Sequence, residues 1–313
     1  MFEVFKTKSW PKNFGFGFLM GAADAIPGVS GGTIALILGI YYKFIKSISS
    51  FLFFFRDRFS EESKKDFLPA LNFLLPLGIG MLFSYYILTK ILVGPDESPG
   101  YLRKDSTAPF IYSFFFGLVL SSIREPWKLV SDPNYRHYMI LSFGIIVIYS
   151  YSSFSFEREV STLLLVVGGL LAITAMLLPG VSGALVLLSL GLYTTIASSF
   201  HDGDFEPLFY LICGGFIGLL VFVPFMNFML QNHLDYTMSL LTGFMAGSLI
   251  PLWPWKEDYA SEGLSSNLGF RYVLESFGFF PLVAVFLFFL GGILMSYGLK
   301  ELEKRISIYH ERL

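Results

Sequence analysis

The chain alternates between long apolar stretches and short polar or charged loops, and eight such stretches can be distinguished. A run of about 20 apolar residues is long enough to cross the hydrocarbon core of a bilayer as an α-helix. Six of the stretches are uninterrupted, and each predicts one membrane-spanning helix. Their approximate ranges are 71–93, 108–123, 138–154, 208–230, 237–252 and 278–298.

The other two apolar stretches, 14–41 and 161–200, each contain a Pro-Gly pair. Proline lacks a backbone N–H donor and glycine adopts open backbone geometries, so a helix breaks at such a pair. Broken backbone cannot face lipid and must be buried in protein or line a wet cavity. We therefore predict that both stretches form re-entrant helical hairpins, which enter the membrane and return to the same side.

The two breaks carry a common sequence. Residues 27–41 read PGVSGGTIALILGIY and residues 179–193 read PGVSGALVLLSLGLY, with nine identities in fifteen positions at a constant offset of 152. Matching breaks in the two halves of a membrane protein indicate an internal repeat with its binding site at the breaks.

Weaker similarities extend the repeat beyond the hairpins. Gly80 recurs as Gly218, and Gly117 recurs as Gly243. Each repeat is predicted to hold one hairpin followed by three spans, and the C-terminal KELEKRISIYHERL predicts an additional short cytoplasmic helix. The predicted repeats cover residues 1–154 and 155–313.

The composition is that of an all-α integral membrane protein. The chain is 54% hydrophobic and 15% charged, whereas soluble proteins carry about 25% charged residues. The net charge of −2 gives no reason to expect a nucleic-acid partner. The single cysteine, Cys213, cannot form an intrachain disulfide, and the four histidines are dispersed. We therefore predict no metal site and no cofactor.

The distribution of charge predicts how the chain crosses the membrane. Lys and Arg gather near the N-terminus, in the loop after the first hairpin, in the 124–137 loop and at the C-terminus, whereas the 201–206 loop has none. Basic loops stay in the cytoplasm. If each hairpin returns to its own side, all basic loops and both termini are cytoplasmic. Three crossings then separate the hairpins, so the repeats are inverted, as in many secondary transporters. If each Pro-Gly stretch were instead one broken span, the repeats would be parallel.

The motif Pro-Gly-Val-Ser-Gly indicates an anion-binding site. The first N–H groups of a helix lack internal partners, and the helix dipole favours negative charge there. Two such ends near the midplane predict a site for one phosphate or carboxylate group; the alternative is that small residues merely permit tight packing. The predicted site residues are Pro27, Gly28, Val29, Ser30, Gly31, Gly32 and Thr33 in the first hairpin, and Pro179, Gly180, Val181, Ser182 and Gly183 in the second.

Two charged residues are further candidates. Asp24 is an acid inside an apolar stretch, and its counterpart in the second repeat is Met176. Acids within membranes are usually functional, so Asp24 is predicted to bind the headgroup or carry a coupled proton, or else to cap nearby backbone N–H groups. Arg124 ends a span and is a candidate phosphate donor. Its alternative role is that of an interfacial anchor paired with Glu125.

The segments GAADAIPGVSGGTIALILGIY and LLPGVSGALVLLSLGLY, with the spans FFFGLVLSS and GFMAGSL, resemble those of the prokaryotic polyprenyl-phosphate transporters. The resemblance covers essentially the whole chain. It implies recycling of the lipid undecaprenyl phosphate from the outer to the inner leaflet of the cytoplasmic membrane for cell-envelope synthesis. It also implies inverted repeats with re-entrant hairpins. The coupling ion and the choice between monomer and homo-oligomer stay open.

The strongest rival is an enzyme. The undecaprenyl-diphosphate phosphatases resemble this chain in having re-entrant hairpins, and they carry a Pro-Gly-x-Ser-Arg-Ser motif. Gly31 and Gly183 stand where that arginine would be, and a paired glutamate motif is lacking. Phosphoryl cleavage requires positive charge on the transferred group and an activated nucleophile or metal. We therefore predict a lipid transporter and no enzyme, with transport of another anionic lipid or solute as a further alternative.

Overall fold

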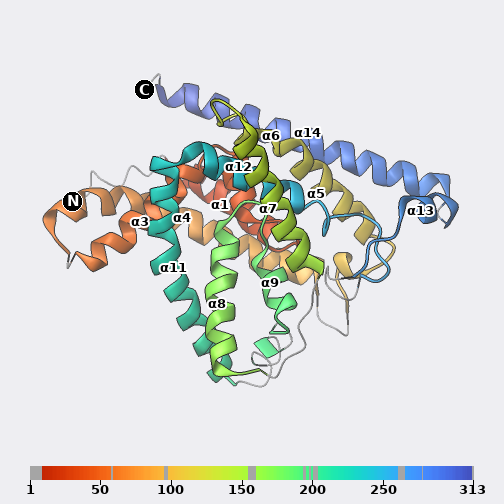
Figure 1. Cartoon of the computed structure of the whole chain (residues 1–313), viewed down its shortest axis with the longest axis horizontal. Coiled ribbons are helices and arrows are strands. Elements are labelled where there is room, and N and C mark those ends of the chain that lie inside the picture. The colour runs from red at the N-terminus through yellow and green to blue at the C-terminus, as the bar shows by residue number, and fades with distance from the viewer. Residues whose placement is uncertain are drawn as a thin grey trace.

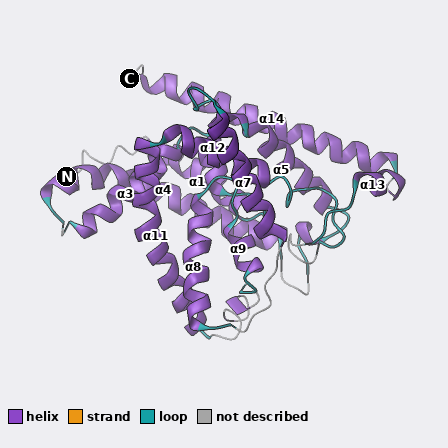
Figure 2. Ribbon diagram, in the orientation of Figure 1, coloured by secondary structure: helices purple, strands orange, loops and turns teal. Residues whose placement is uncertain are grey.

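The described part of the computed structural model consists mainly of helices (Figure 2). It describes residues 9–57, 59–94, 98–153, 160–192, 195–196, 199, 204–259, 265–276 and 278–311. The elements are α1 Trp10–Asp24, α2 Gly31–Ile37, α3 Tyr41–Arg56, α4 Glu61–Leu92, the 3₁₀ helix η3 Tyr101–Arg103, α5 Ala108–Ser122, α6 Arg124–Trp127, α7 Tyr135–Ser153, α8 Thr162–Leu177, α9 Gly183–Ser189, α11 Glu206–Asn232, α12 Leu234–Gly247, α13 Phe270–Ser276 and α14 Phe279–Glu311.

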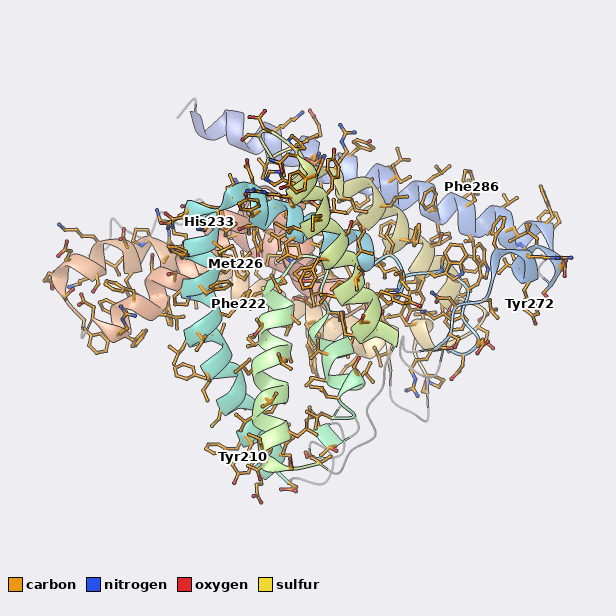
Figure 3. The ribbon with its side chains drawn as sticks, viewed as in Figure 1. Tyr210, Phe222, Met226, His233, Tyr272 and Phe286 are labelled. Carbon is orange, nitrogen blue, oxygen red and sulfur yellow. The ribbon has the colours of Figure 1, made fainter. Side chains whose placement is uncertain are left out.

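Each of the six predicted spans contains a helix, but α12 ends at Gly247, before the end of the predicted span 237–252, and residue 154 of the span 138–154 lies outside the described residues. Three of the helices are long and apolar enough to cross a membrane, namely α4, α11 and the 279–302 part of α14. They expose large apolar side chains, including Leu82, Ile212 and Leu294, which are 68–74% exposed, as expected of a surface that faces lipid. Tyr210 and His233 mark the two ends of α11 (Figure 3).

The other predicted spans are shorter. Helices α5 and α12 have 15 and 14 residues, a length of about 21–23 Å at 1.5 Å per residue. The hydrocarbon core of a bilayer is about 30 Å thick. Crossing by these helices therefore stays a prediction.

The prediction of an additional short helix at the C-terminus was wrong in one respect. It is helical, but it does not form a separate short helix. Helix α14 continues without a break through 33 residues from Phe279 to Glu311. It runs along one edge of the molecule to the C-terminus (Figure 1).

Glycines hold α1 and α4 close together. A Cβ at Gly17 would collide with the backbone carbonyl of Leu77, and a Cβ at Gly80 would collide with that of Phe14. A glycine of each helix therefore lies directly against the backbone of the other helix. This reciprocal contact is how small residues bring helices together in membranes.

The pair α8 and α11 repeats this contact at matching positions. Gly169 lies against the carbonyl of Leu211, and Gly214 lies against that of Val166. Gly169 is 152 residues after Gly17, whereas Gly214 is 134 residues after Gly80. The structural counterpart of Gly80 is therefore Gly214, and the predicted match with Gly218 was wrong by one helical turn.

Two further helix pairs join the halves of the chain. Helix α5 packs against α14, and α12 packs against α7. Between α5 and α14, the Ser113 hydroxyl donates to the Val285 carbonyl at 2.6 Å. The same reciprocal glycine contacts recur in both pairs: Gly117 and Gly292 meet the carbonyls of Phe289 and Phe114, and Gly243 and Gly144 meet those of Leu141 and Leu240.

The contact between α1 and α4 can be tested with a matched pair of variants. Gly17→Ala should destabilise the protein by about 1–3 kcal/mol, because the methyl group forces the helices apart. Gly15→Ala, in the same helix, should be neutral or slightly stabilising, because no other atom lies within 4 Å of its Cβ position and alanine favours helix. Thermal unfolding in detergent measures both. Equal melting temperatures would contradict the packing described.

Candidate functional site

Both Pro-Gly motifs break their helices as predicted, and they do so with matching backbone conformations. Gly28 and Gly180 have φ of +89° and +79°, values that L side chains rarely adopt. Each break leads into a seven-residue helix, α2 or α9. A second pair of matching glycines, Gly39 and Gly191, with φ of +66° and +69°, follows these helices. The repeated sequence thus encodes a repeated turn, helix and turn.

The two tips, far apart in sequence, touch each other. The Gly180 N–H donates to Thr33 Oγ1 at 2.9 Å. The Ser30 hydroxyl lies 3.0 Å from the carbonyl oxygen of Leu178. A Cβ at Gly32 would lie 3.1 Å from the carbonyl oxygen of Leu177. We call this contact the tip junction. It brings together four predicted site residues, namely Ser30, Gly32 and Thr33 of the first hairpin and Gly180 of the second, whereas Gly28 lies beside Leu252 and the Ser182 N–H faces the Tyr151 hydroxyl.

The motif serines act as helix caps at the tip junction. Ser30 accepts a hydrogen bond from the Gly32 N–H at 3.1 Å, and Ser182 accepts one from the Leu185 N–H at 3.4 Å. Both serines are buried, as is Thr33. In this conformation the predicted anion-binding groups therefore bind protein atoms.

Asp24 makes the capping contact that was one of its predicted roles. Its Oδ1 accepts a hydrogen bond from the Gly31 N–H at 2.6 Å. In the second half, Met176 packs against Gly183 in the same place. The two tips thus share a shape but differ in chemistry, since one presents a carboxyl group where the other presents a thioether.

A small cavity of about 30 Å³ lies beside Asp24. That volume is enough for about one water molecule. Both hairpins contribute to its wall, and polar side chains from other elements complete it. Its lining includes Asp24 and Pro27 of the first hairpin, Ala184 and Leu188 of α9, Tyr85 and Thr89 of α4, and Arg103, Tyr112 and Tyr259.

The cation at this cavity is Arg103, which sequence reasoning missed. Arg124, the predicted donor, does not line the cavity; its side chain is 58% exposed and its Nε lies 3.8 Å from Glu125 Oε1. This is the alternative role predicted for it. Arg103 follows a polar loop, so no apolar pattern drew attention to it.

A second cation, Lys256, is buried near the same place. Its Nζ lies 5.3 Å from the ring centre of Tyr112 and 3.3 Å from Asn267 Oδ1. Burial lowers the pKa of Lys256 to about 8. The aromatic neighbours Trp253, Trp255 and Tyr259 in the sequence were a signal for this burial, because a lysine among aromatic residues commonly packs on their faces.

An apolar cavity of about 310 Å³ lies on the other side of the second tip. It reaches the motif at Val181. Apart from the Tyr151, Thr174 and Ser189 side chains its walls are hydrocarbon, so it suits an apolar chain. The lining residues are Val147, Ile148, Tyr151, Leu171, Thr174, Ala175, Leu178, Val181, Val186, Ser189, Leu190 and Phe244.

Comparison with known proteins identifies the family. Residues 20–267 match a family model described as "VCA0040-like: Undecaprenyl phosphate translocase-like". A Vibrio cholerae protein named polyprenyl-phosphate transporter is 32% identical over 255 residues, 80% of each chain. A Staphylococcus aureus protein of the same name is 32% identical over 260 residues, 76% of this chain and 84% of its own. No solved structure matches. The matched region contains Asp24 and both Pro-Gly motifs, and the chain belongs to the undecaprenyl phosphate translocase-like family.

Proposed function

We propose that this protein moves polyprenyl phosphate, the undecaprenyl phosphate carrier lipid, from the outer to the inner leaflet of the cytoplasmic membrane. Two relatives at 32% identity are named polyprenyl-phosphate transporter, which supports this substrate. Both termini face the cytoplasm, as the distribution of basic residues predicts. The protein acts as a transporter, without cleaving the phosphate.

The proposed architecture is an inverted repeat with two re-entrant hairpins. Helices α2 and α9 have seven residues each, about 10 Å, and cannot cross a core about 30 Å thick. This length supports hairpins that return to their own side. The glycine contacts match in both halves. Helix α5 packs against α14 of the other half, and α12 packs against α7 of the other half. Both observations support a repeat that extends over the whole chain.

The observation that carries the proposal is the tip junction. It is held by the Gly180 N–H and by the hydroxyls of Ser30 and Thr33, which bind across it at 2.9–3.0 Å. These same groups are suitable donors to phosphate oxygens once the tips separate. The junction therefore serves as the closed form of the site, and headgroup binding replaces contacts between the tips.

The residues that line the two flanking cavities suit the two parts of the lipid, and the cavity beside Asp24, which holds about one water molecule in this conformation, must widen to admit a phosphate group. Arg103 and Asp24 line the polar cavity, and a guanidinium group is well shaped for phosphate. The apolar cavity at Val181 accommodates the first isoprene units of the tail, while the rest stays in the bilayer. Opening the tips alternately toward each leaflet would then move the headgroup without moving the whole tail through protein.

Asp24 is the proposed coupling residue. Asp24→Asn should retain the hydrogen bond with Gly31, because the amide oxygen can still accept it, but should lose the response of transport to a pH gradient. Leaflet exchange of polyprenyl phosphate in liposomes, with and without an imposed gradient, measures this. An unchanged gradient response in Asp24→Asn would exclude the coupling role and leave capping as its function.

The hydroxyls of the two motif serines give a second prediction. The double variant Ser30→Ala, Ser182→Ala should weaken binding of polyprenyl phosphate by about tenfold, since hydrogen bonds to charged groups are among the stronger ones. Ser161→Ala is the matched control, because Ser161 caps α8 by the same kind of bond, to the Leu164 N–H at 3.2 Å, but is exposed. Equal loss in both proteins would attribute the effect to helix capping.

The whole proposal is tested by reconstituting the purified protein in liposomes with polyprenyl phosphate or diphosphate in one leaflet. Headgroup exposure and released inorganic phosphate are followed together. We expect the monophosphate to change leaflets with no release of phosphate. Release from the diphosphate would favour the phosphatase alternative, and absence of movement under every gradient would reject lipid transport.

A further inference from the structure

A separate cavity of about 370 Å³ lies at the far end of α2 from the tip junction. It is bounded by the turn between α2 and α3, by α6, by the beginning of α12 and by the end of α14. All these segments are on the predicted cytoplasmic side. The lining residues are Leu36, Ile37, Gly39, Tyr41, Tyr42, Glu125, Lys128, Leu129, Met238, Lys300 and Lys304.

The charge in this cavity is unbalanced. Three lysines, Lys128, Lys300 and Lys304, face a single acid, Glu125. Lys128 Nζ lies 3.2 Å from Glu125 Oε1, and Lys300 contacts the same oxygen. The lysines therefore outnumber the carboxylate by two positive charges.

Glu125 is the internal anion of the cavity. Its side chain is only 16% exposed. Burial opposes its ionisation, but hydrogen bonds from Lys300 and Lys128, together with their charges, hold the pKa of Glu125 below its usual value. The carboxylate thus occupies the position that an external anion would take between these two lysines.

Tyr41, the last residue of the first repeated motif, supplies a polar group without a partner. Its ring is 3% exposed, and its hydroxyl oxygen is buried with no hydrogen-bond partner among the described residues. A buried hydroxyl left unsatisfied is costly. Tyr41 lines the cavity, but its hydroxyl is covered by protein, so a ligand with acceptor oxygens would satisfy it after a local shift of the atoms that cover it.

The backbone at the cavity also favours an anion. Helix α3 has 16 residues and begins there, and its N-cap, Ile40, provides no side-chain cap. The N–H groups of its first turn, at Tyr41 and Tyr42, lie at the positive end of the helix dipole. Three lysines, an uncapped helix start and Tyr41, whose hydroxyl has no partner among the described residues, thus lie at one cavity.

We propose that this cavity is a second binding site, specific for a phosphate group carried by a lipid or by free inorganic phosphate. The inference rests on the proposed function in one respect, namely that the phosphate released from the tip junction on the cytoplasmic side is the natural ligand. Arrival of phosphate displaces Glu125 from Lys128 and Lys300. Return of Glu125 to the lysines then helps to expel the phosphate, so that the site releases its ligand instead of trapping it.

Three variants probe distinct parts of the site. Lys300→Gln should weaken phosphate binding by about tenfold or more, since it removes a charged donor. Tyr41→Phe should weaken binding by about threefold to tenfold without destabilising the protein, because the lost hydroxyl has no partner. Glu125→Gln should strengthen binding by about tenfold, since it removes the internal competitor and leaves three lysines.

Matched controls come from the start of α4. Lys64 and Glu61 form an ion pair of the same i, i+3 spacing, at 3.1 Å, outside this cavity. Lys64→Gln and Glu61→Gln should leave binding unchanged. Binding of radiolabelled polyprenyl monophosphate and of radiolabelled inorganic phosphate is measured on full-length protein in nanodiscs. The series is repeated in the Ser30→Ala, Ser182→Ala background, so that the remaining lipid binding reports the second site.

The two probes separate the sources of the phosphate. If the three variants change the binding of polyprenyl monophosphate as predicted, the ligand is the lipid headgroup. If they change the binding of inorganic phosphate as predicted, the ligand is the free anion. If Glu125→Gln weakens binding or leaves both probes unaffected, the second site is rejected. Leaflet exchange by the wild-type protein is measured in parallel, so that loss of the second site with intact transport leaves the proposed function standing.

Discussion

The structure depends on how the backbone groups released by two helix breaks find partners inside a molecule surrounded by lipid. In hydrocarbon no water is available to satisfy them. Here side chains of the first tip satisfy backbone groups of the second, because Thr33 accepts a hydrogen bond from the Gly180 N–H and the Ser30 hydroxyl donates to the Leu178 carbonyl. The first tip binds its own N–H groups, those of Gly31 and Gly32, through Asp24 and Ser30. The first tip is therefore a structural support of the second, quite apart from any ligand.

The same arrangement explains why near-identical motifs have unequal neighbours. Backbone geometry is set by glycines, which recur at matching positions, whereas the residue packed on the returning helix differs between Asp24 and Met176. A symmetric scaffold can thus hold a single carboxyl group on one side. In an alternating-access cycle, such asymmetry would allow one hairpin to respond to protonation while the other acts as a fixed support.

The sequence predicted the breaks and their pairing well, because Pro-Gly interrupts a helix wherever it occurs and the offset of 152 is constant through the motif. It predicted the longer repeat less well. Glycines are frequent in α11, so identity alone placed the partner of Gly80 at Gly218, and only contact with the Val166 carbonyl identified Gly214. Arg103 and Lys256 escaped notice because they come from polar loops that resemble solvated segments. Arg124 attracted notice by ending an apolar span, a position typical of interfacial anchors.

The packing of α5 against α14, a helix of the other half, has a consequence for biogenesis. Helix α5 is complete by Ser122, but its glycine contacts and the Ser113 hydrogen bond are made with α14, which begins at Phe279. During synthesis the side of α5 that carries Ser113 and Gly117 therefore stays without its partner helix until α14 has been made. The contacts that bury this side of α5 in the folded protein are therefore completed only by the helix that is synthesised last.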